Sequence, residues 1–181
     1  MPVTEQTFEQ LALEDDDTTW EMVCGKLREK PGMTQEHNSA MALLAFYLQQ
    51  QLDVAQYRVR ANAGYARRHE QSYFGPDVMV VPTALTLATH GTGGLEVYDA
   101  ALPFVAEVWS PSTGSYDVDT KFPEYRLRGD LEIWRVQPYE KTVTAWRKQA
   151  DGSYTERIYA SGLVPVESLQ GVTIELEKLF E

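Results

Sequence analysis

The sequence predicts a mixed α+β fold in a single domain that spans residues 1–181. Short runs of β-branched and aromatic residues recur between residues 57 and 159, which is typical of strands. Two segments, residues 34–53 and 115–128, are expected to form helices that flank those strands. No internal repeat, low-complexity segment or linker divides the chain, so we expect one domain.

The N-terminal part of the chain predicts two helices around a hairpin. Residues 4–13 have an amphipathic helical pattern, and residues 20–27 have the pattern of a hairpin that turns near Gly25. The long helix should begin after Thr34, whose hydroxyl suits an N-cap. Its apolar residues recur at helical spacing: Ala40, Leu43, Leu44, Tyr47, Leu48 and Leu52.

The rest of the chain predicts strands, one helix and one long connection. Residues 83–101 form the connection, and Pro123 should kink or restart the helix of residues 115–128. A turn at Asp151-Gly152 predicts a hairpin. The expected strands are residues 57–62, 65–68, 77–81, 103–109, 131–136, 142–148 and 154–159.

Composition restricts the class of protein. The chain has 181 residues, of which 43% are hydrophobic, so global disorder is unexpected. It has no apolar run of about 18 residues that could span a membrane, and its first residues lack the pattern of a secretory signal. The lone Cys24 excludes an internal disulfide and a cysteine-based zinc site. We therefore expect a cytoplasmic protein without a membrane span.

Charge is unevenly distributed along the chain. The net charge of −11 disfavours loose binding to a polyanion, but residues 37–149 are nearly neutral, with 12 acids and 11 bases. Four arginines lie there on consecutive strand segments, with tyrosines between them: Arg58, Arg60, Arg67 and Arg68. This group could bind a nucleic-acid backbone, or it could be a solvated sheet face that balances the acidic termini. Both interpretations stay open.

Two acids interrupt apolar strands. Asp77 begins one such strand directly after Pro76, and Glu107 lies inside residues 104–109. Alternation makes both faces of that second strand apolar, which predicts a central strand and a buried Glu107. An uncompensated buried carboxylate costs several kcal/mol. The ordinary alternatives are an ion pair with one of the arginines, or a turn-capping role for Asp77.

A third motif follows on the predicted helix. Asp117, Lys121 and Tyr125 are spaced four residues apart, which places them near one stripe. Taken alone, this stripe could be an ordinary surface ion pair.

Together these motifs resemble the PD-(D/E)-x-K nuclease superfamily, which has the restriction-endonuclease-like fold. In detail the sequence is similar to a bacterial endonuclease family formerly catalogued as a domain of unknown function. The resemblance covers nearly the whole chain and implies a mixed β-sheet flanked by helices, with added β-hairpins. The matching stretches are residues 20–27, Glu36-His37, Pro76-Asp77 with residues 78–81, residues 107–113, the Asp117/Lys121/Tyr125 stripe and residues 129–138. One departure is that Trp109 occupies the lysine position of the superfamily, so that Lys121 is the candidate lysine.

The resemblance implies a metal-dependent nuclease. Hydrolysis of a phosphodiester requires a positioned water and neutralised phosphoryl oxygens, which hard divalent cations on carboxylates provide. We expect Asp77, Glu107 and the Val108 carbonyl to ligate Mg²⁺ or Mn²⁺. Lys121 would position or help deprotonate the water and hold a phosphate oxygen. Glu21 is the implied further acid, although it could also be an exposed hairpin residue.

The histidines predict no metal site of their own, because His37, His69 and His90 lack ligand spacing. His37 heads the long helix in the family's pattern, and we expect it to serve in helix-end packing or capping. The strands at residues 142–148 and 154–159 are prone to be sheet edges, which predicts a homodimer.

Three functions are compatible with these residues. The leading one is a Mg²⁺-dependent endonuclease acting on nucleic acid, with DNA favoured. The second is a catalytically inactive interaction module that keeps the nuclease fold. The third is a glycosidase that uses Asp77 and Glu107 as an acid and base pair, but this assigns no role to Lys121 and ranks last.

Overall fold

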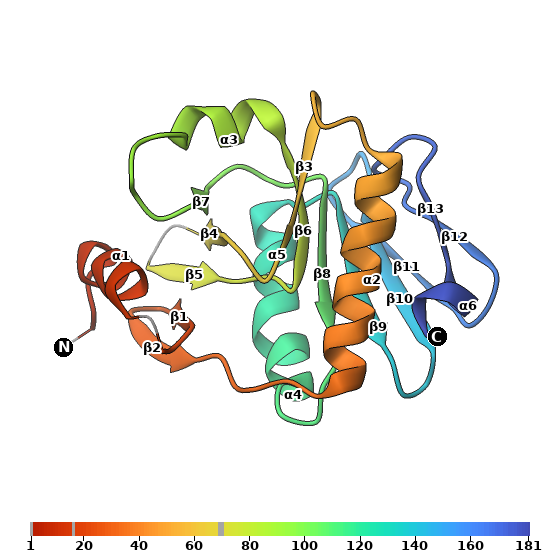
Figure 1. Ribbon diagram of the computed structural model, residues 1–181, viewed down its shortest axis with the longest axis horizontal. Coiled ribbons are helices and arrows are strands. Elements are labelled where there is room, and N and C mark those ends of the chain that lie inside the picture. Colours follow the sequence, from red (N-terminus) through yellow and green to blue (C-terminus); the bar gives the residue numbers. More distant parts are fainter. Residues whose placement is uncertain (1, 16, 69–70) are drawn as a thin grey trace.

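The computed structural model describes residues 2–15, 17–68 and 71–181, so that His69 lies outside the described residues. Its strands form two main sheets and one short two-stranded ribbon (Figure 1). The predicted mixed α+β class is confirmed. No helix in the described part of the chain is both long enough and apolar enough to cross a bilayer.

The larger sheet has six strands in the order β11-β10-β9-β8-β6-β3. Strand β8 is central, as its two apolar faces predicted, and it runs parallel to β9 and antiparallel to β6. Because parallel neighbours need a crossover, the chain passes through a helical segment between β8 and β9. The strand bounds are β3 (Tyr57–Ala61), β6 (Val78–Pro82), β8 (Phe104–Val108), β9 (Glu132–Gln137), β10 (Thr142–Lys148) and β11 (Tyr154–Tyr159).

The second sheet has five strands in the order β2-β1-β5-β4-β7. The predicted hairpin forms with Gly25 in its turn, at a φ of 75° that favours glycine. Its strands are β1 (Trp20–Val23), β2 (Lys26–Glu29), β4 (Tyr65–Arg68), β5 (Ser72–Phe74) and β7 (Val97–Tyr98), and the separate ribbon pairs β12 (Leu163–Pro165) with β13 (Thr173–Glu175).

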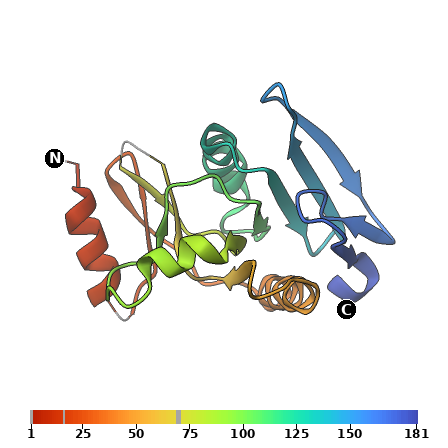
Figure 2. The same cartoon turned by 90° about the horizontal axis from the view of Figure 1, so that it is seen from above.

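Two helices begin after threonine N-caps, of which the one at Thr34 was predicted. The Thr4 hydroxyl accepts the N–H of Thr7, and the Thr34 hydroxyl accepts the N–H of His37. Figure 2 shows α2 and α5 on opposite faces of the larger sheet, with α1 at the far end of the molecule from β11. The helices are α1 (Glu5–Glu14), α2 (Gln35–Gln51), α3 (Thr83–Thr89), α4 (Gly114–Tyr116), α5 (Phe122–Arg128) and α6 (Leu176–Leu179).

The crossover helix is interrupted by a π turn at Asp117–Lys121. Here the N–H of Phe122 donates to the Asp117 carbonyl, five residues back rather than four. Pro123 has no N–H to donate, so the regular α-helical ladder cannot pass through it. The helix restarts at Phe122, which confirms the prediction from Pro123.

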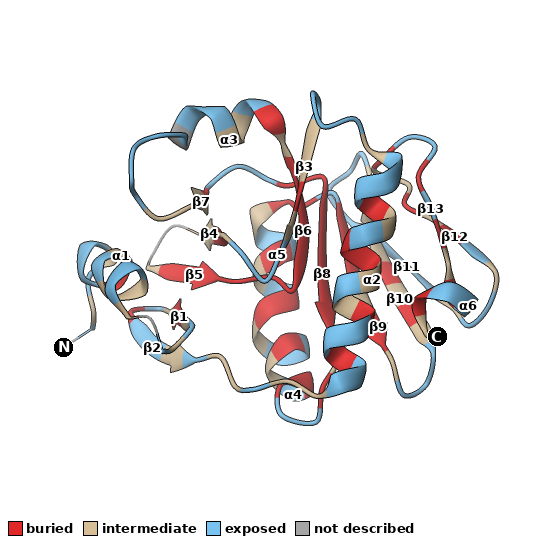
Figure 3. Ribbon diagram, in the orientation of Figure 1, coloured by how far each residue is buried: buried red, intermediate tan, exposed pale blue. Residues whose placement is uncertain are grey.

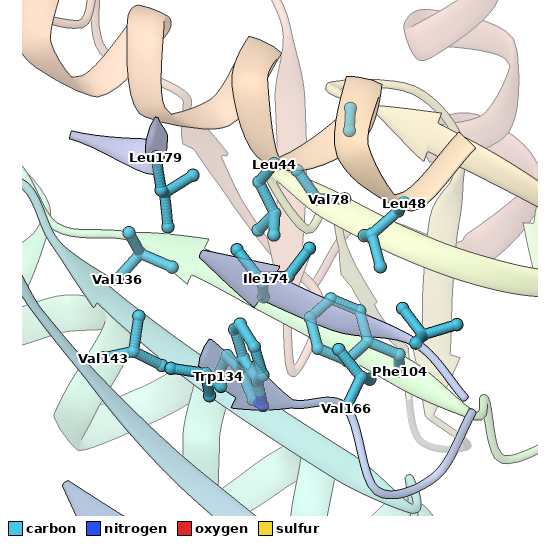
Figure 4. Packing of buried hydrophobic residues seen from close by; sticks show 14 of the residues in the cluster. Leu44, Leu48, Val78, Phe104, Trp134, Val136, Val143, Val166, Ile174 and Leu179 are labelled. Carbon is cyan, nitrogen blue, oxygen red and sulfur yellow. The ribbon is translucent and has the colours of Figure 1, made fainter. Parts of the chain in front are cut away.

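The main core lies between α2 and the larger sheet. Leu44 and Leu48 of α2 point toward Phe104 and Trp134 on the sheet, and Ile174 of the ribbon lies among them (Figure 4). Trp134 is fully buried. The central strands are buried along their length, whereas the helices expose their outer faces (Figure 3).

Three expectations about the strands and connections are wrong. Residues 83–101 contain α3 and β7 rather than only a connection, and β5 is an additional strand of three residues. Strands of two or three residues are too short to show alternation. In addition, β10 is an internal strand paired with both β9 and β11, so that of the two predicted edges only β11 lies at an edge of the sheet.

Candidate active site

The predicted acids and the predicted lysine converge on one narrow pocket. Glu21 comes from β1, Asp77 precedes β6, Glu107 lies in β8 and Lys121 ends the π turn. Each of these four residues is at most 2% exposed. The interior of the pocket has a volume of about 10 Å³, room for about one water molecule. Residues 100 positions apart in the chain therefore share one small buried site.

Lys121 reaches the glutamates from the helix. Its Nζ lies 2.8 Å from Glu21 Oε1, 3.1 Å from Glu107 Oε1 and 3.9 Å from Asp117 Oδ1. Asp117 and Lys121 are four residues apart and lie on the same side of the helix, within the π turn. The ammonium thus reaches the glutamate although Trp109 fills the strand position.

The Asp77 carboxylate contacts residues from three other segments of the chain. Its Oδ2 accepts the main-chain N–H of Val108 at 2.8 Å and lies 2.9 Å from His37 Nε2. Its Oδ1 lies 2.9 Å from Lys30 Nζ. Burial alone would raise the pKa of Asp77, but the Lys30 ammonium and the His37 hydrogen bond lower that pKa below its ordinary value. Asp77 is therefore a carboxylate fixed beside the end of β8.

Glu107 lies in the most crowded part of the cluster. The Tyr125 hydroxyl donates to its Oε1 at 2.5 Å, and Lys121 contacts the same oxygen. Burial raises the pKa of Glu107 well above its ordinary value; Lys121 opposes this shift, and the negative charges of Asp77 and Asp117 add to it. Burial also raises the pKa of Tyr125, which stays a hydrogen-bond donor.

Acids outnumber lysines in the pocket. Four carboxyl groups, those of Glu21, Asp77, Glu107 and Asp117, face the ammonium groups of Lys30 and Lys121. Burial raises the pKa of Asp117 to about 6 although Lys121 pulls it down. The pKa of Lys121 is raised well above its ordinary value, because its acidic neighbours outweigh its burial. The carboxyl groups of the cluster thus outnumber its ammonium groups, and burial together with their mutual proximity raises the pKa values of two of them.

The donor set fits a hard divalent cation. No three Asp, Glu, His or Cys side chains converge as a ready-made metal site within the described ranges, because lysines lie between the carboxylates. Mg²⁺, however, is usually held by one or two carboxylates, with waters and substrate oxygens completing its shell. Asp77 Oδ1 is buried and lies near the Lys30 ammonium. This oxygen accepts no hydrogen bond from any described residue. Asp77 and Glu107 are the two carboxylates of the pocket that would serve as such ligands.

A scan of protein families finds one match that covers almost the whole chain. The model of the Uma2 family, described as "Putative restriction endonuclease", matches residues 5–177. The chain belongs to the Uma2 family. The predicted resemblance to the restriction-endonuclease-like superfamily is thereby confirmed.

A solved structure has the same fold as this Uma2 chain. It is a crystal structure described as "a putative nuclease belonging to DUF820" from Anabaena variabilis, with a TM-score of 0.78. The similarity covers 99% of this chain and 98% of that chain at 19% sequence identity, so it shows the fold alone. No curated protein matches the chain.

The four predicted nucleic-acid-binding arginines of this Uma2 chain do not share one sheet. Arg58 and Arg60 lie in β3 of the larger sheet, whereas Arg67 and Arg68 lie in β4 of the other. Within the described ranges, Arg58 has no acid within 4.0 Å. The other three form ion pairs, namely Arg60–Glu96, Arg67–Asp99 and Arg68–Glu124. Their binding of nucleic acid stays a prediction.

Two site residues of the Uma2 chain differ from expectation or were missed. The main chain of His37 is capped by Thr34, but its ring faces Asp77, so packing or capping is not its whole role. Lys30 contacts Asp77 and the Gly75 carbonyl from the loop after β2. Sequence patterns gave no signal for Lys30, because a lysine after a short hairpin strand resembles an ordinary solvated residue.

Proposed function

We propose that this chain is a Mg²⁺- or Mn²⁺-dependent endonuclease that hydrolyses phosphodiester bonds of nucleic acid, with DNA as the favoured substrate. The observation that carries this proposal is the buried Lys121 ammonium, which lies within 3.1 Å of both Glu21 and Glu107 in a pocket that also contains Asp77. The description of the Uma2 family and the nuclease fold support the class of reaction.

Asp77, Glu107 and the main-chain carbonyl of Val108 would hold the cation. When bound, a divalent cation neutralises charge on the phosphoryl oxygens and supports the attack of water. Hydrogen bonds within the chain already hold two of these three ligand groups in place. The Val108 N–H fixes the Asp77 carboxylate, and the Tyr125 hydroxyl and Lys121 fix that of Glu107. Such fixed geometry lowers the reorganisation needed during reaction.

Lys121 and Glu21 would act on the water and the phosphate. The Lys121 ammonium donates hydrogen bonds within the pocket and is positioned to orient the attacking water or hold a phosphate oxygen. Glu21 accepts the N–H of Gly75 at 2.8 Å, which holds its carboxylate against the Lys121 ammonium. Glu21 would thereby supply a further acceptor that orients water.

Cleavage of nucleic acid tests this proposal. Plasmid and single-stranded DNA are incubated with Mg²⁺ or Mn²⁺ and wild-type protein, or with Asp77→Asn, Glu107→Gln or Lys121→Ala. Each variant should cleave at least about 100-fold more slowly, the typical loss when one group that stabilises the transition state is removed. Asp119→Asn is the matched control, because Asp119 lies on the same π turn and is exposed. Equal cleavage by wild type and all three site variants would reject the proposal.

Metal binding separates this proposal from a catalytically inactive interaction module. One observation favours the inactive module, namely that Lys30 already pairs with the Asp77 oxygen that a cation would need. Isothermal titration of the wild type with Mg²⁺ should give heat that disappears in Asp77→Asn. A titration without any Asp77-dependent heat would favour the module.

A further inference from the structure

Arg28 lies at the mouth of the carboxylate pocket. It stands directly opposite Glu21 in the antiparallel pairing of β1 with β2, and residues opposite one another project from the same face of a sheet. Arg28 lines the pocket together with Glu21, Lys121 and Tyr116. The hairpin therefore carries an acid of the proposed reaction and a cation side by side.

Unlike the two lysines of the pocket, Arg28 has no acid partner in the part of the chain that the structure describes. Lys121 is held by Glu21 and Glu107, and Lys30 is held by Asp77. Among residues that the structure describes, no carboxylate lies within 4.0 Å of the Arg28 guanidinium, and no hydrogen bond engages it. Its five N–H donors are therefore available to a ligand.

Tyr116 fixes the orientation of this guanidinium. The Arg28 guanidinium carbon lies 3.4 Å from the centroid of the Tyr116 ring, which is stacking distance. Stacking holds the guanidinium plane without using its N–H groups. Burial and the neighbouring Glu21 carboxylate raise the pKa of the Tyr116 hydroxyl, so the ring under the guanidinium stays uncharged. The N–H groups of the stacked guanidinium thus lie at one side of the pocket.

The size and charge of the pocket indicate which ligand the N–H groups of Arg28 would bind. An interior volume of about 10 Å³ holds about one water molecule, so a phosphate oxygen that reaches Lys121 leaves the rest of the backbone at the mouth. The lysines of the pocket are engaged by its carboxyl groups, and the chain has a net charge of −11, which disfavours a polyanion. A fork of N–H donors on a free guanidinium matches a phosphate in both charge and geometry.

We propose that Arg28, held by Tyr116, binds a phosphate of the nucleic-acid backbone at the mouth of this pocket and sets that strand against the carboxylates. This inference rests on the proposed function for its substrate. Arg28 would be a contact to the backbone and would not read the sequence of bases.

Salt-dependent binding tests the contact without catalysis. Single-stranded DNA, duplex DNA and RNA oligonucleotides are titrated with protein in a chelator, over about 50–200 mM salt. Loss of one phosphate contact in Arg28→Met should lower the slope of log K against log salt by about 0.9 on duplex and about 0.7 on single strands. Arg28→Lys keeps the charge and should keep the slope, while cleavage with Mg²⁺ falls because the stacked fork is lost. Arg157→Met is the control, since Arg157 is 68% exposed on β11 at the other end of the molecule.

The outcomes distinguish this inference from the proposed function. An unchanged salt slope in Arg28→Met, with cleavage by the wild type intact, overturns the Arg28 contact and leaves the nuclease. An Arg28-dependent slope without cleavage in Mg²⁺ or Mn²⁺ supports the contact and rejects the nuclease. Wild-type protein that binds none of the three nucleic acids overturns the contact as well. If Arg28→Met fails to fold, Arg28→Gln, which keeps part of the stem over Tyr116, must show the same change in slope.

Discussion

Replacing Arg128 with methionine should destabilise the fold by about 3–5 kcal/mol, the typical cost of breaking a buried ion pair by removing one partner. The Arg128 side chain is 1% exposed, and its Nε donates to Asp130 Oδ2 at 3.1 Å. Its guanidinium also donates to the carbonyls of Ala100 at 2.8 Å and Tyr98 at 3.0 Å, and to that of Arg67. Arg128 thus joins α5 and the start of β9 to β4 and β7 of the other sheet.

Thermal and urea unfolding measure this loss. A domain of this size loses about 2–4 °C in Tm per kcal/mol, so the Tm of Arg128→Met should fall by roughly 6–20 °C. Arg157→Met is the matched control, because Arg157 is exposed and pairs at 3.3 Å with a Glu167 that Arg147 also contacts. The control should change the free energy of unfolding by less than about 1 kcal/mol. A loss of less than about 1 kcal/mol in Arg128→Met as well would refute the role of Arg128 as a clamp between the sheets.

The loss should also depend on pH through Asp130. Burial raises the pKa of Asp130, and Arg128 lowers it. Removal of Arg128 should raise the pKa of Asp130 in the folded state further above its value in the unfolded chain. A raised carboxyl pKa in the folded state means that protonation favours folding, so the deficit of the variant should shrink as pH falls toward that pKa. A deficit that stays constant or grows with falling pH would show that Asp130 does not carry the effect.

Two further predictions concern the two ends of the molecule. The ring centroid of Phe8 lies 5.6 Å from that of Tyr65 and 4.7 Å from that of Tyr73, and Phe8 is fully buried. Phe8→Ala should therefore lower the free energy of unfolding by about 3–5 kcal/mol in urea unfolding, and limited proteolysis of the variant should remove α1. An α1 that stays docked and protected from protease would contradict this prediction. At the other end, β11 lies at the edge of the larger sheet, and we propose that two copies of the chain pair along this strand. In gel filtration the wild type should elute as a dimer and Ile158→Lys as a monomer, because Ile158 is 67% exposed on that strand. Elution of the wild type at the monomer mass of 20.5 kDa would exclude the dimer.

How well each strand could be predicted follows from its length. The hairpin of β10 and β11 was predicted to the residue, because six or seven residues show alternation and Asp151-Gly152 marks the turn. In contrast, β7 has two residues and β5 has three, and their pairing depends on backbone hydrogen bonds with β4 that leave no pattern of side chains. Short strands of this kind are defined by tertiary contacts rather than by local sequence.

The cations of the site were harder to predict than its acids. Asp77 and Glu107 stood out because an acid inside an apolar strand is costly, so that its presence needs a reason. Lys30 and Arg28 lie in or beside a four-residue strand with exposed neighbours, where a charged residue has no cost. Only the fold shows that Lys30 pairs with Asp77 and that Arg28 stacks on Tyr116.

The displaced lysine shows what the pocket requires. Trp109 occupies the strand position where the superfamily has lysine, yet the Lys121 ammonium lies 3.1 Å from Glu107, delivered from a helix. The requirement is therefore a positive charge at one point beside the carboxylates, and a long flexible side chain can meet it from either element. The same helix also carries Asp117, whose carboxylate lies 3.9 Å from the Lys121 ammonium, so the helical route places an acid beside the lysine as well.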